Sequence, residues 1–219
     1  MKAIYFDTET TGLNCHSCQI IELAMLTVED GEIVEEYDKF VKVDGFLPSR
    51  IVQITGITDQ ILAKEGVDER DIADDLKERL SEGTVMIAHN CQFDFSFVHA
   101  LLERHYPLEA DDIVSRVDWI DTVTVLKDRK DYPHKLIDAV EYYEIEKVNF
   151  HRAIDDTKAL YNVVQKMKYE RDDLKEYKNI FGYNPKYGKP KLKLDIIIFK
   201  PQPYHNRGKL PQKEILPRK

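Results

Sequence analysis

The fold and the chemistry of this chain are decided by the stretch Phe6-Asp7-Thr8-Glu9-Thr10-Thr11-Gly12. It ends a segment, residues 2–9, in which side chains alternate as they do in a β-strand. Because successive side chains of a strand point to opposite faces, Asp7 and Glu9 lie on the same face. Neighbouring carboxylates repel each other, and a bound cation relieves that repulsion. The stretch alone fits either a solvated strand end or a ligand site, with a turn at Gly12 whose backbone can approach a ligand closely.

The rest of the chain predicts an α/β fold with a mixed sheet. Strands are expected at residues 20–28, 33–43, 85–88 and 117–121, with a hairpin turn at Glu29-Asp30-Gly31. Helices are expected at residues 70–81, 94–105, 135–143 and 152–168, with short helices and turns between 48 and 62. A meander of three strands followed by alternating helices and strands is typical of this class.

Two further carboxylates occur where helices begin. Asp94 follows the apolar strand 85–88, at the kind of strand exit where α/β proteins place ligand sites. An acid in a first turn is often only a favourable partner of the helix dipole. In the helix 152–168, Asp156 falls on the inner apolar stripe, whereas Asp155 lies about 100° around the helix and faces solvent. Asp156 is therefore the predicted site residue.

Four acids from three segments that point inward are difficult to bury, because each uncompensated anion costs several kcal/mol. Oxygen ligands favour Mg²⁺ or Mn²⁺, and four carboxylates can hold two such ions about 3.5–4 Å apart for attack at phosphorus. His151, in loop-like sequence before the last helix, is predicted to take a proton from the attacking water as general base. The predicted metal ligands are Asp7, Glu9, Asp94 and Asp156.

These clusters resemble the motifs of the DEDDh exonucleases of the ribonuclease H-like fold, which include the proofreading exonucleases of bacterial replicative polymerases. Asp7 and Glu9 resemble the first motif, and Asp94, in His-Asn-x-x-Phe-Asp, resembles the second. His151 and Asp156 resemble the third motif in its histidine version. The stretch Ile54-Thr55-Gly56-Ile57-Thr58 resembles the proofreading group in particular. The resemblance covers roughly residues 2–168.

The resemblance implies a mixed five-stranded sheet flanked by helices, two divalent cations, and release of nucleoside 5′-monophosphates from a 3′ end. It favours DNA, single-stranded above all, in a proofreading or repair role. An enzyme of ribonuclease T type that trims RNA 3′ ends is the alternative, and a non-catalytic nucleic-acid-binding module is a more distant one. It also implies substrate contacts, with Leu13 wedging the terminal base, from Thr10, Thr11, Gly12, Leu13, His89, Asn90 and Phe93.

Charge is unevenly distributed along the chain, whose formal net charge is −8. Residues 177–219 carry eleven Lys/Arg and two Asp/Glu, a charge of +9, while the other 176 residues carry 21 basic and 38 acidic groups. We therefore expect an exonuclease domain over residues 1–176. Residues 177–219 are expected to form a basic Pro/Lys-rich extension, partly extended or weakly ordered, with residues 194–199 compatible with one strand. Such an extension suits a phosphate backbone or a polymerase or replication partner.

The remaining composition argues for a cytoplasmic protein. No apolar run approaches the roughly 20 residues of a membrane helix, so no membrane partner is expected. The first residues turn acidic too early for a signal peptide. The three cysteines, an odd number, argue against a disulfide framework.

Overall fold

The structure, a computed structural model, describes residues 2–146, 152–190 and 194–202. Its centre is a mixed sheet in the strand order β3-β2-β1-β4-β5-β6-β7. The strands are β1 (Lys2–Thr10), β2 (Ile20–Glu29), β3 (Glu32–Phe40), β4 (Val85–Ala88), β5 (Asp118–Asp121), β6 (Ile180–Tyr183) and β7 (Ile198–Pro201). β1, β2 and β3 form the predicted antiparallel meander, and β4 to β7 continue the sheet in parallel pairs from β1.

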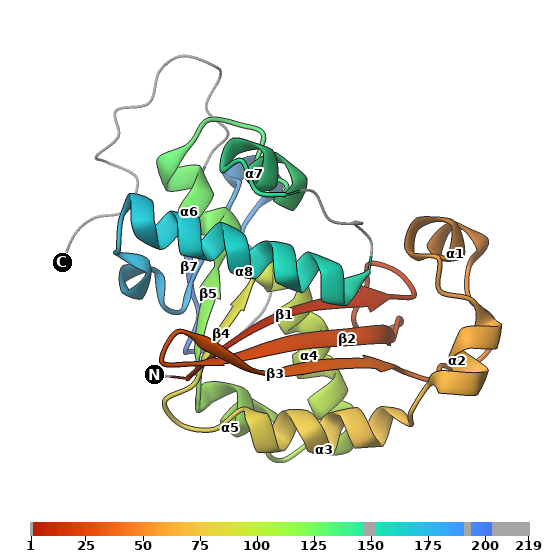
Figure 1. The fold of residues 1–219 in the computed structure, drawn as a ribbon. Helices are drawn as coiled ribbons and strands as arrows, with labels where there is room; N and C mark the ends of the chain where they lie inside the picture. The colour runs from red at the N-terminus through yellow and green to blue at the C-terminus, as the bar shows by residue number, and fades with distance from the viewer. Residues whose placement is uncertain (1, 147–151, 191–193, 203–219) are drawn as a thin grey trace.

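Helices cover both faces of this sheet (Figure 1). They are α1 (Ser49–Thr55), α2 (Asp59–Glu65), α3 (Glu69–Arg79), α4 (Cys91–His105), α5 (Ala110–Ser115), α6 (Thr122–Arg129), α7 (Leu136–Tyr142) and α8 (Ala153–Glu170). The predicted long helices begin and end within three residues of α3, α4, α7 and α8. Among the described residues, no helix combines the length and apolar character needed to cross a bilayer.

Alternation along β1 divides the core into two layers. Ile4 and Phe6 pack in the layer that holds α3, α4 and α5. Ala3 and Tyr5 pack in the other layer, which holds α8. Asp7 and Glu9 continue the Tyr5 face, because strand side chains repeat every second residue. The two acids at the end of β1 are therefore directed toward α8.

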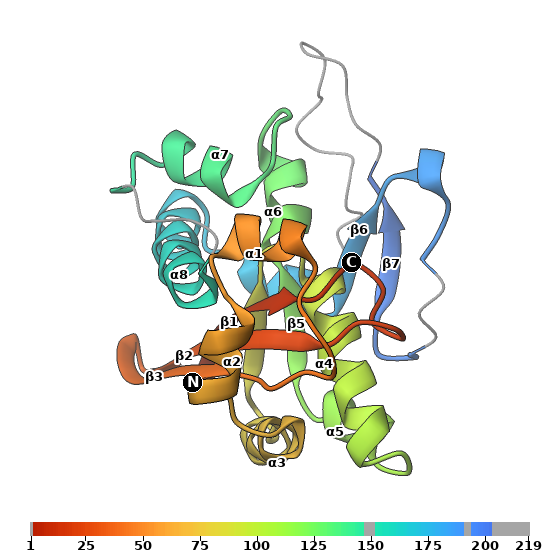
Figure 2. The same ribbon diagram turned by 90° about the vertical axis from the view of Figure 1, so that its right-hand side faces the viewer.

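The sheet has two strands more than the five predicted, and both come from residues 177–219. Ile180 of β6 pairs with Ile120 of β5, and β7 adds to β6. Phe181 is fully buried, with its ring edge-to-face against Phe95 at 5.9 Å between centroids. Figure 2 shows the two strands at the edge of the sheet beyond β5. The beginning of the predicted extension is thus part of the core, and β7 starts four residues later than the strand considered at residues 194–199.

Candidate active site

The first cluster of acids forms where the end of β1 meets the first turn of α8. Carboxylate oxygens of Asp7, Glu9 and Asp156 all lie within 4.8 Å of one another, and all three side chains are half-buried. Asp156 reaches this point because it lies on the inner face of α8, as the apolar stripe predicts. Its neighbour Asp155 is not a member of the cluster. The structure therefore brings three of the four predicted metal ligands into one group.

The fourth predicted ligand, Asp94, lies beside this group. It belongs to the first turn of α4 and is 3% exposed. Its Oδ1 accepts hydrogen bonds from the backbone N–H of Thr8 at 3.1 Å and from the Thr8 hydroxyl at 2.6 Å. Because Thr8 stands between Asp7 and Glu9, these bonds fix the α4 carboxylate next to the acidic end of β1. Asp94 is not within the 4.8 Å group itself.

The electrostatics of the four acids indicate a cation site. Burial raises the pKa of Asp7 well above its ordinary value, and repulsion by Asp94 and Asp156 raises it further. The pKa of Glu9 rises to about 8, first through burial and then through repulsion by Asp156 and Glu22. Burial raises the pKa of Asp94 to about 7, against the opposing effect of the Thr8 hydrogen bonds. Clustered, partly desolvated carboxylates with no cationic side chain among the ligands fit a hard divalent cation.

A pH dependence of stability follows from these shifts. Acids with raised pKa values keep their protons in the folded state where the unfolded chain has lost them, so the free energy of unfolding falls as pH rises. In EDTA, the thermal unfolding midpoint should therefore decrease as the pH is raised from about 4 to about 8. These limits are the ordinary pKa values of carboxylic acids and the folded value of Glu9. Saturating Mg²⁺ should flatten this dependence, and so should Glu9→Gln in EDTA. A midpoint that rises across this window in EDTA contradicts the electrostatic description.

A fifth acid, Glu22, was missed by the sequence analysis. It lies in β2 opposite Glu9 and is fully buried. Its carboxylate accepts from Nη2 of Arg152 at 2.7 Å and from the backbone N–H of Ala153 at 3.1 Å. This anchors the first residues of α8 to the sheet. A glutamate in the middle of the apolar run 20–28 was the available signal, since a buried acid requires a partner.

The histidine of the second motif has a structural role. One ring nitrogen of His89 lies 2.9 Å from the Thr122 hydroxyl, and the other lies 2.9 Å from the backbone oxygen of His134. Burial lowers the pKa of His89, which favours the neutral ring. Both ring nitrogens therefore have partners within the protein, and the substrate contact predicted for His89 stays a prediction. His89 instead joins the end of β4 to α6 and to the segment before α7.

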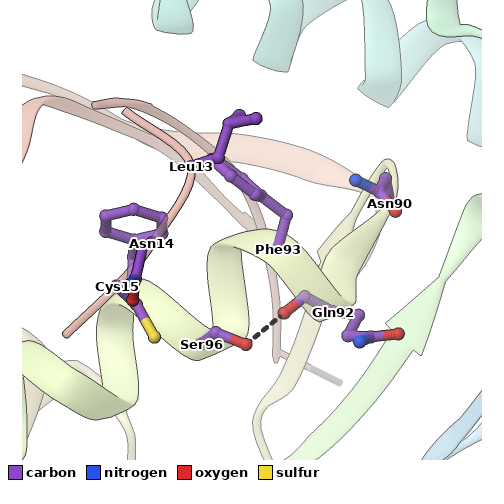
Figure 3. Close-up of a pocket in the computed structure, with 8 residues that line it drawn as sticks. Leu13, Asn14, Cys15, Asn90, Gln92, Phe93 and Ser96 are labelled. Atoms are coloured by element: carbon purple, nitrogen blue, oxygen red, sulfur yellow. Dashed lines mark hydrogen bonds between the residues drawn. The ribbon is translucent and has the colours of Figure 1, made fainter. Parts of the chain in front are cut away.

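Several of the other predicted substrate contacts line a hollow of about 450 Å³ beside α4. Figure 3 shows Leu13 from the turn after β1 together with side chains from the start of α4. Leu13 is 89% exposed. The lining residues are Leu13, Asn14, Cys15, Asn90, Gln92, Phe93, Ser96 and Phe97. A hollow of mixed polar and apolar lining, with two phenylalanines on the helix that also carries Asp94, suits a nucleotide base.

Two of the residues predicted to contact substrate also make bonds within the turn after β1. The Thr10 hydroxyl is buried and donates to the backbone oxygen of Gly12 at 2.7 Å. The Thr11 hydroxyl accepts from the backbone N–H of Gln19 at 3.0 Å. A Cβ on Gly12 would lie 2.8 Å from the sulfur of Cys18, so a larger residue here would have to displace the Cys18 side chain. The predicted general base, His151, lies outside the described residues, and all three cysteines are free.

The sequence of this chain is similar to a part of two DNA polymerases. DNA polymerase III PolC-type of Bacillus subtilis (strain 168) is 34% identical over 168 residues, which cover 75% of this chain and 11% of the polymerase. The corresponding protein of Thermotoga petrophila is 32% identical over 162 residues, covering 71% and 11%. The chain thus spans about a tenth of the length of these relatives.

Solved structures with the same fold include E. coli exonuclease I in complex with a dA16 oligonucleotide. The TM-score is 0.71 at 19% identity, with 80% of this chain and 42% of that one covered. The complex of exonuclease I with SSB-Ct matches at a TM-score of 0.68 and 17% identity, covering 80% and 43%. At this identity the likeness concerns the fold, and it confirms the ribonuclease H-like architecture expected from the sequence.

A family model, described as Exonuclease and named RNase_T, matches residues 4–164. This range runs from β1 to the middle of α8, so it contains the whole acidic cluster. The chain therefore belongs to the exonuclease family that the RNase_T model describes.

Proposed function

We propose that this protein is a metal-dependent 3′→5′ exonuclease that hydrolyses phosphodiester bonds at the 3′ end of DNA and releases nucleoside 5′-monophosphates. The observation that carries the proposal is the meeting of Asp7, Glu9 and Asp156 within 4.8 Å, with Asp94 fixed beside them through Thr8. Membership of an exonuclease family supports the same reaction class.

We further propose that two divalent cations, Mg²⁺ or Mn²⁺, are held by Asp7, Glu9, Asp94 and Asp156. When bound, such ions supply Lewis acidity at the scissile phosphate and a nucleophilic water at neutral pH. The contribution of the protein is to hold the four carboxylates in a partly dry site and to orient the strand end. His151, placed by the sequence ahead of α8, is proposed to accept the proton of the attacking water.

Single-stranded DNA is the proposed substrate. The hollow beside α4 offers Leu13 and Phe93 to a terminal base, and stacking on such side chains needs no particular base. The two similar proteins described above are DNA polymerases, and the solved structures with the same fold include an exonuclease bound to a DNA oligonucleotide. The distinction between DNA and RNA concerns the 2′-hydroxyl. The alternative substrate is therefore RNA, which an enzyme that trims RNA 3′ ends would prefer.

A competition assay tests the substrate class. Equal concentrations of DNA and RNA oligonucleotides of one sequence, each with its own 5′ fluorophore, are digested together in Mg²⁺, and the released mononucleotides are identified by mass spectrometry. We expect the DNA to shorten first and the products to be deoxynucleoside 5′-monophosphates. Faster shortening of the RNA assigns the chain to RNA 3′-end trimming. Tight binding of both strands, with no cleavage of either, indicates a non-catalytic binding module.

We also propose that residues 1–176 are the exonuclease domain and that residues 177–219 extend it. Strands β6 and β7 support the sheet, and residues 203–219 add five basic side chains and one acidic one. These basic groups are proposed to contact the phosphate backbone of the substrate, or a polymerase or replication partner. We propose that the protein acts in the cytoplasm. Deletion of the whole extension is not a clean test, because Tyr177, Phe181 and Gln202 are buried.

Truncation after Gln202 tests the proposed role of the basic residues. Each lost phosphate contact should reduce the slope of log binding constant against log salt by about 0.7 for a single strand. We expect the truncated protein to bind single-stranded DNA more weakly at low salt and with a shallower slope, while its turnover of saturating substrate is kept. An unchanged slope rules out contact of these residues with the phosphate backbone. Binding to a polymerase or replication partner is then the remaining proposed role.

A further inference from the structure

The buried carboxylate of Asp121 closes a network beneath the candidate active site. Asp121 ends β5 and is 3% exposed. Its Oδ1 accepts the backbone N–H groups of Asn90 at 3.0 Å, Cys91 at 3.1 Å and Val123 at 3.0 Å. Its Oδ2 accepts the hydroxyl of Thr124 at 2.7 Å. One side chain thus satisfies amides at the starts of both α4 and α6, where helices leave backbone donors unpaired.

Two of these bonds, from Asn90 and Cys91, hold the turn by which α4 leaves the sheet. Asn90 has φ 67° and ψ 44°, a left-handed conformation that non-glycine residues adopt only where their surroundings hold it. The side chain of Asn90 makes no capping bond to the helix, so the bonds to the Asp121 carboxylate, together with those of His89, hold this turn. Asp94 follows in the first turn of α4. The direction of its carboxylate toward Thr8 therefore depends on the turn that Asp121 holds.

The C-terminal strands β6 and β7 contact Asp121 indirectly, through Thr124. The Thr124 hydroxyl, which donates to Asp121, accepts the backbone N–H of Gly182 in β6 at 2.7 Å. Gln202, just after β7, donates its side-chain amide to the Thr124 backbone oxygen at 3.0 Å and is 1% exposed. A Cβ on Gly182 would lie 1.7 Å from the Gln202 side-chain oxygen, so β6 leaves space for this contact only with glycine.

We propose that Asp121 is a positioning residue for the exonuclease reaction, and that β6 and β7 take part in catalysis indirectly by holding it through Thr124. The inference rests on the proposed function, because the consequence of a displaced turn is a displaced Asp94. It gives the segment 177–202 a role distinct from nucleic-acid binding. The chain of contacts runs from Gln202 and Gly182 through Thr124 and Asp121 to the start of α4.

The test compares Asp121→Ala, Asp121→Asn and Thr124→Val with a matched control. Thr84→Val is the control, because Thr84 is an equally buried threonine at the opposite end of β4. Three experiments are done on each protein. They measure hydrogen exchange of the Asn90 and Cys91 amides without metal, the affinity for Mn²⁺, and the kcat and KM on single-stranded DNA. The exchange measurement needs no activity, so it separates failure of the network from failure of the proposed function.

We expect Thr124→Val and Asp121→Ala to accelerate exchange at both amides and to lower Mn²⁺ affinity or kcat about 10- to 100-fold, the range for residues that orient metal ligands, with KM little changed. Asp121→Asn, which keeps one acceptor oxygen, should recover part of the loss, and Thr84→Val should match the wild type. If Asp121→Ala does not fold, the result for Thr124→Val decides whether the proposal holds. Variants that lose thermal stability but keep Mn²⁺ affinity and kcat overturn the proposal.

Discussion

Replacement of Asp156 by asparagine is expected to lower kcat by about a thousandfold or more, whereas Asp155→Asn should leave it within about twofold. Loss of one of the carboxylates that would hold the proposed cations should remove several kcal/mol of transition-state stabilisation, and each 1.4 kcal/mol corresponds to about tenfold in rate. Asp156 shares the cluster with Asp7 and Glu9, and Asp155 does not. The two residues are adjacent on one helix, so the pair tests the geometry with nearly equal changes in charge.

Single-turnover kinetics on a 5′-labelled oligonucleotide, together with Mn²⁺ titration, measure both variants. The Asp156 variant should bind Mn²⁺ more weakly and keep its folded structure, because removal of a repelling charge relieves its neighbours. The Asp155 variant should bind Mn²⁺ as the wild type does. A severe loss in Asp155→Asn beside an active Asp156→Asn refutes the assignment of the inner face of α8.

His151→Ala is expected to lower kcat by about 10²- to 10⁴-fold, the usual contribution of a general base, and to leave Mn²⁺ affinity unchanged. The reason is chemical: four carboxylates already suffice as ligands, and a neutral imidazole accepts a proton near pH 7. The rise of kcat with pH in the wild type should report this group, and the variant should lack it. Weakened Mn²⁺ binding in His151→Ala makes the histidine a ligand or a support of the fold.

The side chains whose positions the sequence predicts and the structure shows are those fixed by local periodicity. The two-residue spacing of Asp7 and Glu9 on a strand places both acids on one face whatever the rest of the chain does. Helical spacing likewise places Asp156 on the apolar side of α8 and separates it from Asp155. The strand exit before Asp94 is marked by the continuous apolar run of β4. Each of these signals lies within a few residues of the side chain that it predicts.

The features that were missed depend on partners distant in the chain. Glu22 bonds to Arg152, 130 residues away, and His89 bonds to Thr122 and to His134, 33 and 45 residues away. No local pattern contains such information. The geometry shows that His89 and Glu22 support the elements that carry the predicted ligands.

The missed elements are short. Strands β6 and β7 have four residues each and lie among glycine, proline and lysine, which favour an extended surface segment in sequence-based prediction. Their place in the sheet is set by pairing with β5, which sequence alone does not reveal. Helix α6 begins directly after β5, and its alternation of threonine and valine resembles a continuing strand. Tertiary context decides both cases.

The central claim is that the acidic cluster cuts nucleic acid from the 3′ end with divalent cations. Digestion of 5′-labelled single-stranded DNA in Mg²⁺, in Mn²⁺ and in EDTA, beside folded Asp7→Ala protein, tests it most directly. We predict a ladder that shortens one nucleotide at a time from the 3′ end, requires the cation, and disappears in Asp7→Ala. Cleavage that persists in EDTA or in Asp7→Ala, or digestion that starts at internal bonds, contradicts the claim.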